Sequence, residues 1–278
     1  MKYLLNFINK EKIVNLLLFG FLIKILVLIF YGVPDFGDVL AYKRAGEEIF
    51  SLKLVSTTIH MPGYGVWMYF WNYFLQNSYG VIFADIIIST ITIYIVYCIS
   101  KIIFQDEVTS RITLIICCFY PFFIFYSISS LSETLYVFLL FLSILLFYKN
   151  LFFLGSLSII FSIYVKSISL FIAPILIIVF YIFVHKHSLI NTLKKLLLYF
   201  ALFCTFLAPW WLHNFKKYDT FVITDLSYGY HLFSGNNPEN TTGGGIGGRD
   251  ITHTNYVPNY DYYNADLAIK ADKIFKEK

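Results

Sequence analysis

The sequence predicts an all-α membrane protein, a polytopic bundle of about seven transmembrane helices. Apolar residues make up 58% of the 278 residues and charged residues 14%, whereas soluble domains contain about 45–50% and about 25%. Phe, Trp and Tyr together reach 21%, which is typical of helix surfaces and interface belts in membrane proteins. Long apolar runs also recur along the whole chain, so the composition excludes an ordinary soluble domain.

The apolar runs define the expected helices in order. A helix needs about 20 apolar residues to cross the hydrocarbon core of a bilayer. Seven runs approach this length, and the fifth is the shortest. The predicted spans are Ile13–Val33, Gly80–Phe104, Ile112–Ile128, Leu131–Tyr148, Leu151–Val165, Ser167–Val184 and Leu193–Leu212.

The basic residues predict the orientation of these spans, because cytoplasmic loops carry more Lys and Arg than outer loops. With a cytoplasmic N-terminus, more basic residues lie inside than in the outer loops before the tail. The inner set is Lys2, Lys10, Lys12, Lys101, Arg111, Lys149, Lys186, Lys194 and Lys195, and the outer set is Lys43, Arg44, Lys53 and Lys166. Seven spans then place the C-terminal tail outside.

The chain divides into two predicted regions. Residues 1–212 form the transmembrane core, with an outer loop at residues 34–79, and residues 213–278 form a polar, non-cytoplasmic tail that ends in the start of a further helix. The outer loop carries an amphipathic helix on which Asp38, Tyr42 and Ala45 share one face. A second, short helix around "VWMYFW" is rich in Trp and Tyr and is expected at the outer interface.

Asp38 is the first candidate for chemistry. It follows Gly37 and opens the amphipathic helix, so one interpretation is an N-cap that satisfies free backbone N–H groups. The other is a general base, which a helix N-terminus would keep ionised and able to accept a proton. Asp35 is the rival candidate for the base and also suits a turn.

Several motifs around these residues carry a resemblance to a known family. "GDVLAYKRA" followed by "HMPGYGVW" resembles the first outer loop of polyprenyl-phosphate-sugar-dependent glycosyltransferases of the GT-C fold. That family includes the dolichyl-phosphate-mannose protein mannosyltransferases and bacterial relatives that modify lipopolysaccharide and other envelope glycans. Asp38 and Tyr42 are in register, while Met61-Pro62 stands where the family usually has two prolines. Further matches follow in order along nearly the whole chain: "SSLSETLYVF" with Glu133, then Lys166, "APWWLHNF" and "LFSGNNP".

The resemblance implies a GT-C-like fold in a bacterial inner (plasma) membrane and an inverting sugar transfer at its outer face. The implied donor is a polyprenyl-phosphate-linked sugar, and the implied acceptor is a lipid-linked glycan, as in lipopolysaccharide biosynthesis, or a protein. Asp38 matches the family's catalytic base. No cofactor is firmly implied, and the need for a divalent cation stays open.

Five further residues are candidates for substrate binding, namely Asp35, Tyr42, His60, Glu133 and Lys166. Lys166 either stabilises the leaving phosphate or simply extends toward the headgroups from a helix end. Glu133 either orients the acceptor or a cationic partner, or pairs with a helix dipole. His60 either donates to the phosphate or caps the interface turn.

Two kinds of site are not predicted, and one charged residue falls inside a predicted span. No His, Asp and Glu cluster has the spacing of metal ligands, so no metal site is predicted. The basic residues are scattered, so nucleic-acid binding is not predicted either. Lys24 falls midway along the first span, where a charge is costly, and is expected to pack or pair inside the bundle, with Asp85 as one possible partner.

The chain departs from the family at its C-terminal end. Relatives usually continue into several more spans, whereas this chain stops at "ADKIFKEK", which predicts a truncated or split protein. The alternative function is therefore a catalytically inactive remnant, or a non-enzymatic membrane assembly or flippase-partner subunit.

Overall fold

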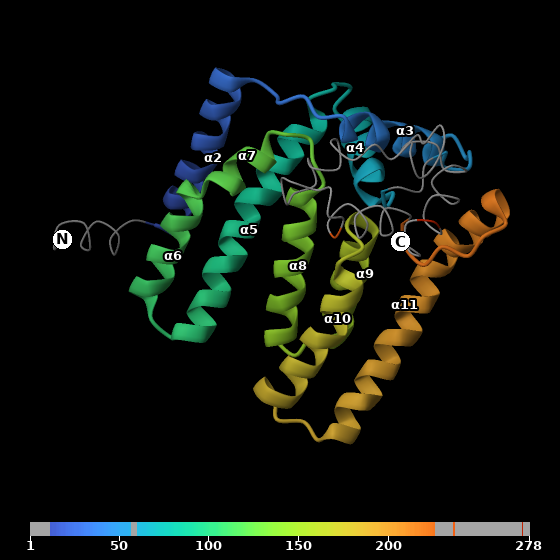
Figure 1. The fold of residues 1–278 in the computed structure, drawn as a ribbon. Helices are drawn as coiled ribbons and strands as arrows, with labels where there is room; N and C mark the ends of the chain where they lie inside the picture. Colours follow the sequence, from blue (N-terminus) through green and yellow to red (C-terminus); the bar gives the residue numbers. More distant parts are fainter. Residues whose placement is uncertain (1–11, 57–59, 226–235, 237–273, 275–278) are drawn as a thin grey trace.

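The computed structural model describes residues 12–56, 60–225, 236 and 274, and within these residues the fold is helical throughout, with no strand (Figure 1). The predicted "LFSGNNP" motif and the helix start near the C-terminal end lie almost entirely outside this part. The elements are α2 Ile13–Tyr31, α3 Asp38–Phe50, α4 Gly63–Phe74, α5 Gly80–Phe104, α6 Glu107–Phe119, α7 Pro121–Ser127, α8 Glu133–Tyr148, α9 Phe152–Val165, α10 Ser169–Ile178, the π-helix η1 Val179–Val184 and α11 Leu189–Tyr218.

The helices form a bundle with two distinct ends (Figure 1). α5 packs against α2, α6 and α8, and α8 packs in turn against α9. α3 and α4 contact each other and lie at the end where α5 and α8 begin. We call this the capped end, and the opposite end carries the turns that join α5 to α6, α8 to α9 and η1 to α11.

In the part of the chain that the structure describes, three helices are long and apolar enough to cross a membrane: α2, α5 and α11. The pair α6 and α7 makes a fourth span if its two helices count as one. α8, α9 and the combined α10 and η1 are apolar but shorter. The prediction of a helical membrane bundle therefore agrees with the structure, whereas the number of seven spans stays a prediction.

The predicted span Ile112–Ile128 consists of two helices, which can still form one bent span. α6 and α7 meet at a bend of 49°. Tyr120 adopts an extended conformation between them, with φ −65° and ψ 117°. The cause is Pro121, which disfavours the helical conformation in the residue before it and supplies no backbone donor.

The helices differ in how much of their surface other helices cover. α5 buries most of its length, and Ile86 and Ile93 are fully enclosed. α2 and α11 bury few residues and expose large apolar side chains such as Phe30 and Leu197. In water such a surface would be unfavourable, but lipid tails cover it at no comparable cost.

Candidate functional site

Two short helices at the capped end hold the predicted outer-loop residues. α3 and α4 approach closely because glycines meet at their crossing, and a Cβ added to Gly46 would overlap the Gly65 carbonyl oxygen. A Cβ on Gly65 would lie 2.5 Å from the Tyr42 carbonyl oxygen. The packing buries Tyr42 and Ala45, which belong to the predicted shared face of α3.

Asp38 and His60 form a pair at this end. Asp38 is the first residue of α3, directly after the N-cap Gly37. Its Oδ1 lies 3.5 Å from Nε2 of His60, and the two side chains are 46% and 22% exposed. The first turn of a helix favours an ionised carboxylate. A partly exposed carboxylate beside an imidazole is a group that can accept a proton from an incoming hydroxyl or amine.

Tyr42 connects the Asp38–His60 pair to the start of α8. Its hydroxyl lies 3.1 Å from Oγ of Ser132, the N-cap of α8. Its ring lies 5.1 Å from the His60 ring and 5.0 Å from the Tyr64 ring, measured between centroids. The buried Tyr42 side chain therefore fixes where α3 rests against the start of α8.

Glu133 and Lys166, which the sequence assigned to separate roles, form one ion pair. Lys166 Nζ lies 2.9 Å from Glu133 Oε1, with side chains 35% and 29% exposed. Glu133 is the first residue of α8, and Lys166 directly follows α9. Glu133 Oε2 is buried and accepts no hydrogen bond from any residue that the structure describes. Both side chains lie at the capped end, because α8 begins there and α9 ends there (Figure 1).

Asp35 is not brought into this set of contacts. It lies in the loop between α2 and α3, and its side chain is exposed. The two carboxylates therefore differ in their surroundings: Asp38 pairs with His60, whereas Asp35, three residues earlier, is exposed in the loop.

Asp85 does not pair with Lys24, for which the sequence offered it as one possible partner. It is fully buried in α5, and its two oxygens accept hydrogen bonds from Tyr64 Oη at 2.6 Å and from Trp67 Nε1 at 2.8 Å. Lys24, the expected partner, is also fully buried but donates to Thr90 Oγ1 at 3.2 Å. The spacing of Tyr64 and Trp67, which places both on one face of α4, was the available signal for this network.

The Asp85 network anchors α4 to α5. Burial raises the pKa of Tyr64 well above its usual range, and the Asp85 carboxylate raises it further. Tyr64 therefore keeps its proton and remains a hydrogen-bond donor. Because the Tyr64 ring packs edge-on against Tyr42, the anchor also supports the aromatic contact on which His60 rests.

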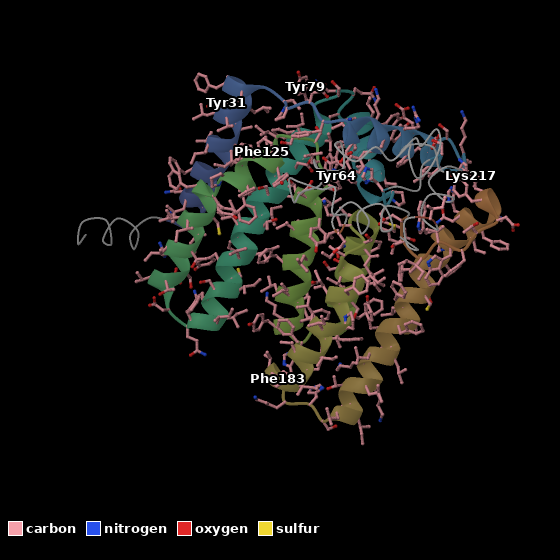
Figure 2. All side chains as sticks on the ribbon, in the orientation of Figure 1. Tyr31, Tyr64, Tyr79, Phe125, Phe183 and Lys217 are labelled. Atoms are coloured by element: carbon pink, nitrogen blue, oxygen red, sulfur yellow. The ribbon has the colours of Figure 1, made fainter. Side chains whose placement is uncertain are left out.

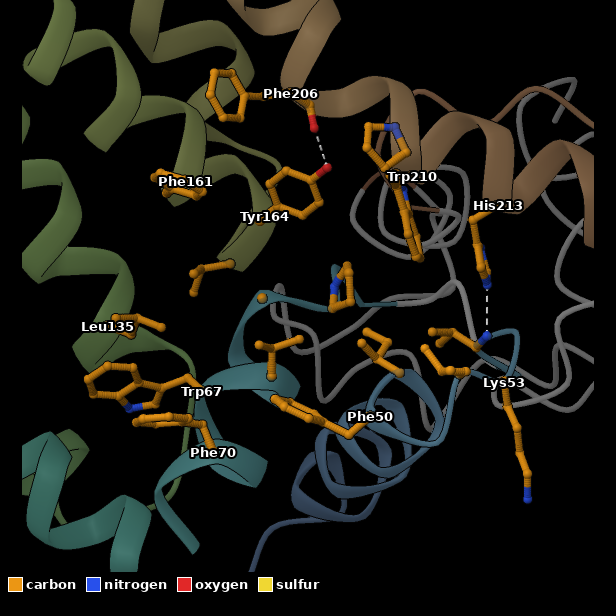
Figure 3. A pocket seen from close by; sticks show the side chains of 18 residues that line it. Phe50, Lys53, Trp67, Phe70, Leu135, Phe161, Tyr164, Phe206, Trp210 and His213 are labelled. Carbon is orange, nitrogen blue, oxygen red and sulfur yellow. Dashed lines mark hydrogen bonds between the residues drawn. The ribbon is translucent and has the colours of Figure 1, made fainter. Parts of the chain in front are cut away.

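A cavity of about 710 Å³ opens beside this site, between α3, α4, α9 and α11 (Figure 3). Its walls are mostly apolar and aromatic, and Trp67, Tyr164 and Trp210 surround the space (Figure 3). Polar groups are few: Tyr164 Oη donates to the Phe206 carbonyl oxygen, and His213 Nε2 accepts from Val55 N at 2.7 Å. The volume lies in the range of small-molecule sites, about 300–1,000 Å³.

A second cavity of about 510 Å³ lies on the other side of α8, between α5, α6, α7 and α8. Glu133 is its one charged lining residue, and the rest of the lining is mainly aliphatic and aromatic. The first cavity reaches Leu135 and Val165, so the two cavities flank the start of α8 near the Glu133–Lys166 pair. Asp38 and His60 line neither of them.

Within the described residues, no group of three or more His, Cys, Asp or Glu side chains is placed to hold a metal ion. Comparison of the chain with protein-family models, curated proteins and solved structures finds no match. The site is therefore interpreted from its own geometry.

Proposed function

We propose that this chain is a membrane glycosyltransferase of the GT-C type, with about seven spans and its capped end at the outer face of a bacterial plasma membrane. It moves a sugar from a polyprenyl-phosphate donor to a lipid-linked glycan or a protein. The observation that supports this most is a continuous set of contacts across the capped end. It runs from Asp38 to His60, through Tyr42 to Ser132, and from the adjacent Glu133 to Lys166.

The proposed step is an inverting substitution at the anomeric carbon. An acceptor oxygen or nitrogen attacks that carbon and forms the new glycosidic bond, while Asp38 takes the acceptor's proton. The bond between the anomeric carbon and the phosphate oxygen breaks, and its electron pair stays on the lipid phosphate. Lys166 stabilises the negative charge that develops there, as a fixed cation near a leaving group does.

The larger cavity suits the carrier lipid of the donor. Its aromatic and apolar walls exclude water, and its lining includes Val165, the residue directly before Lys166. An isoprenoid chain in this space places its phosphate near the capped end, where Lys166 competes for it with Glu133. The proposal assigns no metal ion.

A non-enzymatic membrane subunit is the second candidate function. The observation that favours it is that Asp38 lines neither cavity, while Lys166 is already balanced by Glu133. On this account both pairs stabilise the capped end without touching a substrate.

A transfer assay separates the two candidates. Membranes containing the full chain are incubated with a panel of polyprenyl-phosphate sugars that carry a radiolabelled sugar, together with lipid-linked glycan acceptors. The enzymatic proposal expects labelled acceptor above the level in membranes without the chain, for at least one donor. Labelling that never exceeds that background across the panel contradicts it and favours the subunit.

A further inference from the structure

A second polar region lies at the end of the bundle opposite α3 and α4. Tyr64 marks the capped end, and Phe183 of η1 marks the opposite end (Figure 2). The chain here supplies six basic or imidazole side chains from two turns and the first part of α11. We call them the basic cluster: Lys149, His185, Lys186, His187, Lys194 and Lys195.

The ring of Tyr181 forms the centre of the basic cluster. Lys195 Nζ lies 4.4 Å from the Tyr181 ring centroid and 4.5 Å from that of Phe152. The His185 and His187 rings lie 5.2 Å and 5.3 Å from Tyr181. Cation–π contacts hold an ammonium in place without neutralising it. Lys195 is therefore fixed in position and keeps its charge available to an anion.

Backbone contacts fix the turn that carries the two histidines. The π-helix η1 ends at Val184, and His185 N and His187 N donate to Phe180 O and Tyr181 O at 2.8 Å and 2.7 Å. His185 Nε2 also lies 2.7 Å from the Phe147 carbonyl oxygen, near the end of α8. This contact brings the turn after η1 beside the turn after α8, which carries Lys149.

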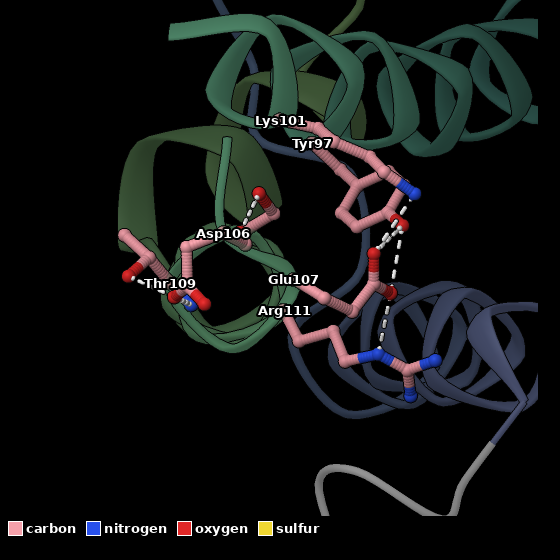
Figure 4. A network of polar contacts seen from close by, with 7 residues as sticks. Tyr97, Lys101, Asp106, Glu107, Thr109 and Arg111 are labelled. Carbon is pink, nitrogen blue, oxygen red and sulfur yellow. Dashed lines mark hydrogen bonds and ion pairs between the residues drawn. The ribbon is translucent and has the colours of Figure 1, made fainter. Parts of the chain in front are cut away.

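Among the residues that the structure describes, no acidic side chain is recorded in contact with the basic cluster. The sequence contains no Asp or Glu from Thr134 to Tyr218. At this end of the described structure, Glu107 already binds Lys101, Arg111 and Tyr97 (Figure 4).

The other carboxylate at this end, Asp106, is also engaged locally. It accepts hydrogen bonds from the hydroxyl and backbone N–H of Thr109, and these bonds lower its pKa (Figure 4). The α5–α6 side of this end therefore holds its acids in local contacts, while the charged residues described on the α8–α11 side are all basic.

We propose that the basic cluster binds the phosphate group of an anionic phospholipid from the leaflet at this end of the bundle. The surrounding surface favours a lipid over a free phosphate. Phe183, Leu189 and Ile190 flank the cluster and are 63%, 74% and 68% exposed, so they contact the acyl chains of a lipid whose phosphate meets Lys195. Basic sites between transmembrane helices recognise anionic headgroups in this manner.

Lipid retention by the purified full chain tests the proposal. The protein is reconstituted in vesicles of equal parts phosphatidylglycerol and phosphatidylcholine, extracted in mild detergent and examined by native mass spectrometry. The wild type is expected to retain phosphatidylglycerol over phosphatidylcholine. Each basic side chain near a membrane surface changes anion binding by about fivefold, so Lys195→Gln with Lys194→Gln lowers the retention ratio by about that factor or more.

Lys43→Gln with Arg44→Gln is the matched control, because it removes two exposed charges at the capped end. It is expected to keep the wild-type ratio. Equal retention of the two lipids by the wild type overturns the proposal, whatever the variants do. An equal loss of phosphatidylglycerol in both double variants also overturns it, because the effect is then one of net charge. Displacement of the lipid by millimolar inorganic phosphate would identify a free-phosphate site instead and would likewise contradict the lipid.

Discussion

Lys166 Nζ lies 2.9 Å from Glu133 Oε1 at the capped end of the bundle. The contact joins the start of α8 to the end of α9, two positions well apart in sequence. The pair holds the Lys166 ammonium in position and sets the Glu133 carboxylate beside it, where the carboxylate competes with any other anion for Lys166. A lipid phosphate that uses Lys166 must therefore share it with Glu133 or displace Glu133.

The competition predicts opposite effects of two substitutions on donor affinity. Glu133→Gln frees Lys166, so the KM for the polyprenyl-phosphate donor is expected to fall, whereas Lys166→Gln is expected to raise it. Stability changes little in either variant, by about 0–1 kcal/mol, because the pair is partly exposed. Donor titration of transfer rates provides the measurement. Lys101→Gln, which breaks a 2.9 Å pair with Glu107 at the other end, is the control. A rise of KM in both capped-end variants would contradict the competition.

Asp85 is expected to be the most sensitive position between α4 and α5. Asp85→Ala leaves Tyr64 Oη and Trp67 Nε1 without their acceptor in a buried place, at a cost of about 1–3 kcal/mol for each donor. Asp85→Asn keeps one acceptor oxygen and is expected to lose less. Thermal unfolding in detergent is expected to give the highest midpoint for the wild type, a lower one for Asp85→Asn and the lowest for Asp85→Ala. An Ala variant as stable as the wild type would show that the network does not hold α4 to α5.

The α3–α4 crossing predicts a steric effect at two glycines. Gly46→Ala and Gly65→Ala each push a methyl group into backbone of the facing helix, so both are expected to lower the unfolding midpoint and disturb the Asp38–His60 pair. Gly20→Ala is a matched control, since its methyl group meets the Cys118 thiol, a side chain that can rotate. An equal fall of the unfolding midpoint in all three variants would show that the close backbone approach of α3 and α4 does not determine the loss of stability.

Lys24 is expected to serve packing rather than chemistry. It is fully buried, and its described hydrogen bond goes to Thr90. Lys24→Met keeps the volume and removes a charge from an apolar span, so its unfolding midpoint is expected to equal or exceed that of the wild type. Lys24→Ala leaves a cavity and loses about 2 kcal/mol or more. Loss of transfer by a stably folded Met variant would instead give Lys24 a role in the site.

Orientation is tested by labelling from one side of the membrane. Lys43→Cys lies on α3 at the capped end, and Lys194→Cys lies in the basic cluster. The predicted topology expects a membrane-impermeant maleimide added outside intact cells to label the first and spare the second until the cells are opened. Of the four native cysteines, Cys118 is buried and the other three are partly exposed, so the wild-type chain labelled in parallel gives the background. The reverse pattern would place the capped end in the cytoplasm.

The sequence predicted the bounds of a helix well where polar turn residues flank its apolar run. The bounds of α5 were predicted at Gly80 and Phe104 because a polar turn precedes it and Gln105-Asp106 follows it. The short aromatic helix α4 was also expected, from a run too short to span. The bend at Pro121 was missed because the span was predicted from the mean hydropathy of a whole run, to which a single proline contributes little although it interrupts the helix.

The site was predictable residue by residue but not as an arrangement. Asp38, His60, Glu133 and Lys166 were named from local patterns and from the family resemblance, yet the Glu133–Lys166 pair depends on α8 and α9 packing side by side. Asp85 was named as one possible partner of Lys24, because a charge inside an apolar span usually faces a partner or a cavity. In the folded chain, the Asp85 carboxylate instead accepts hydrogen bonds from two neutral donors on α4, Tyr64 and Trp67.

The central claim is that Asp38 accepts the proton of the incoming acceptor, and a comparison of three proteins tests it most directly. Transfer rates are measured for wild type, Asp38→Asn and Asp35→Asn, each at equal amounts of membrane-inserted protein. Asp38→Asn is expected to lower kcat by about 10²–10⁴-fold, while Asp35→Asn, which alters an exposed carboxylate outside the contacts of the site, stays near wild type. Transfer by Asp38→Asn at the wild-type rate would contradict the account.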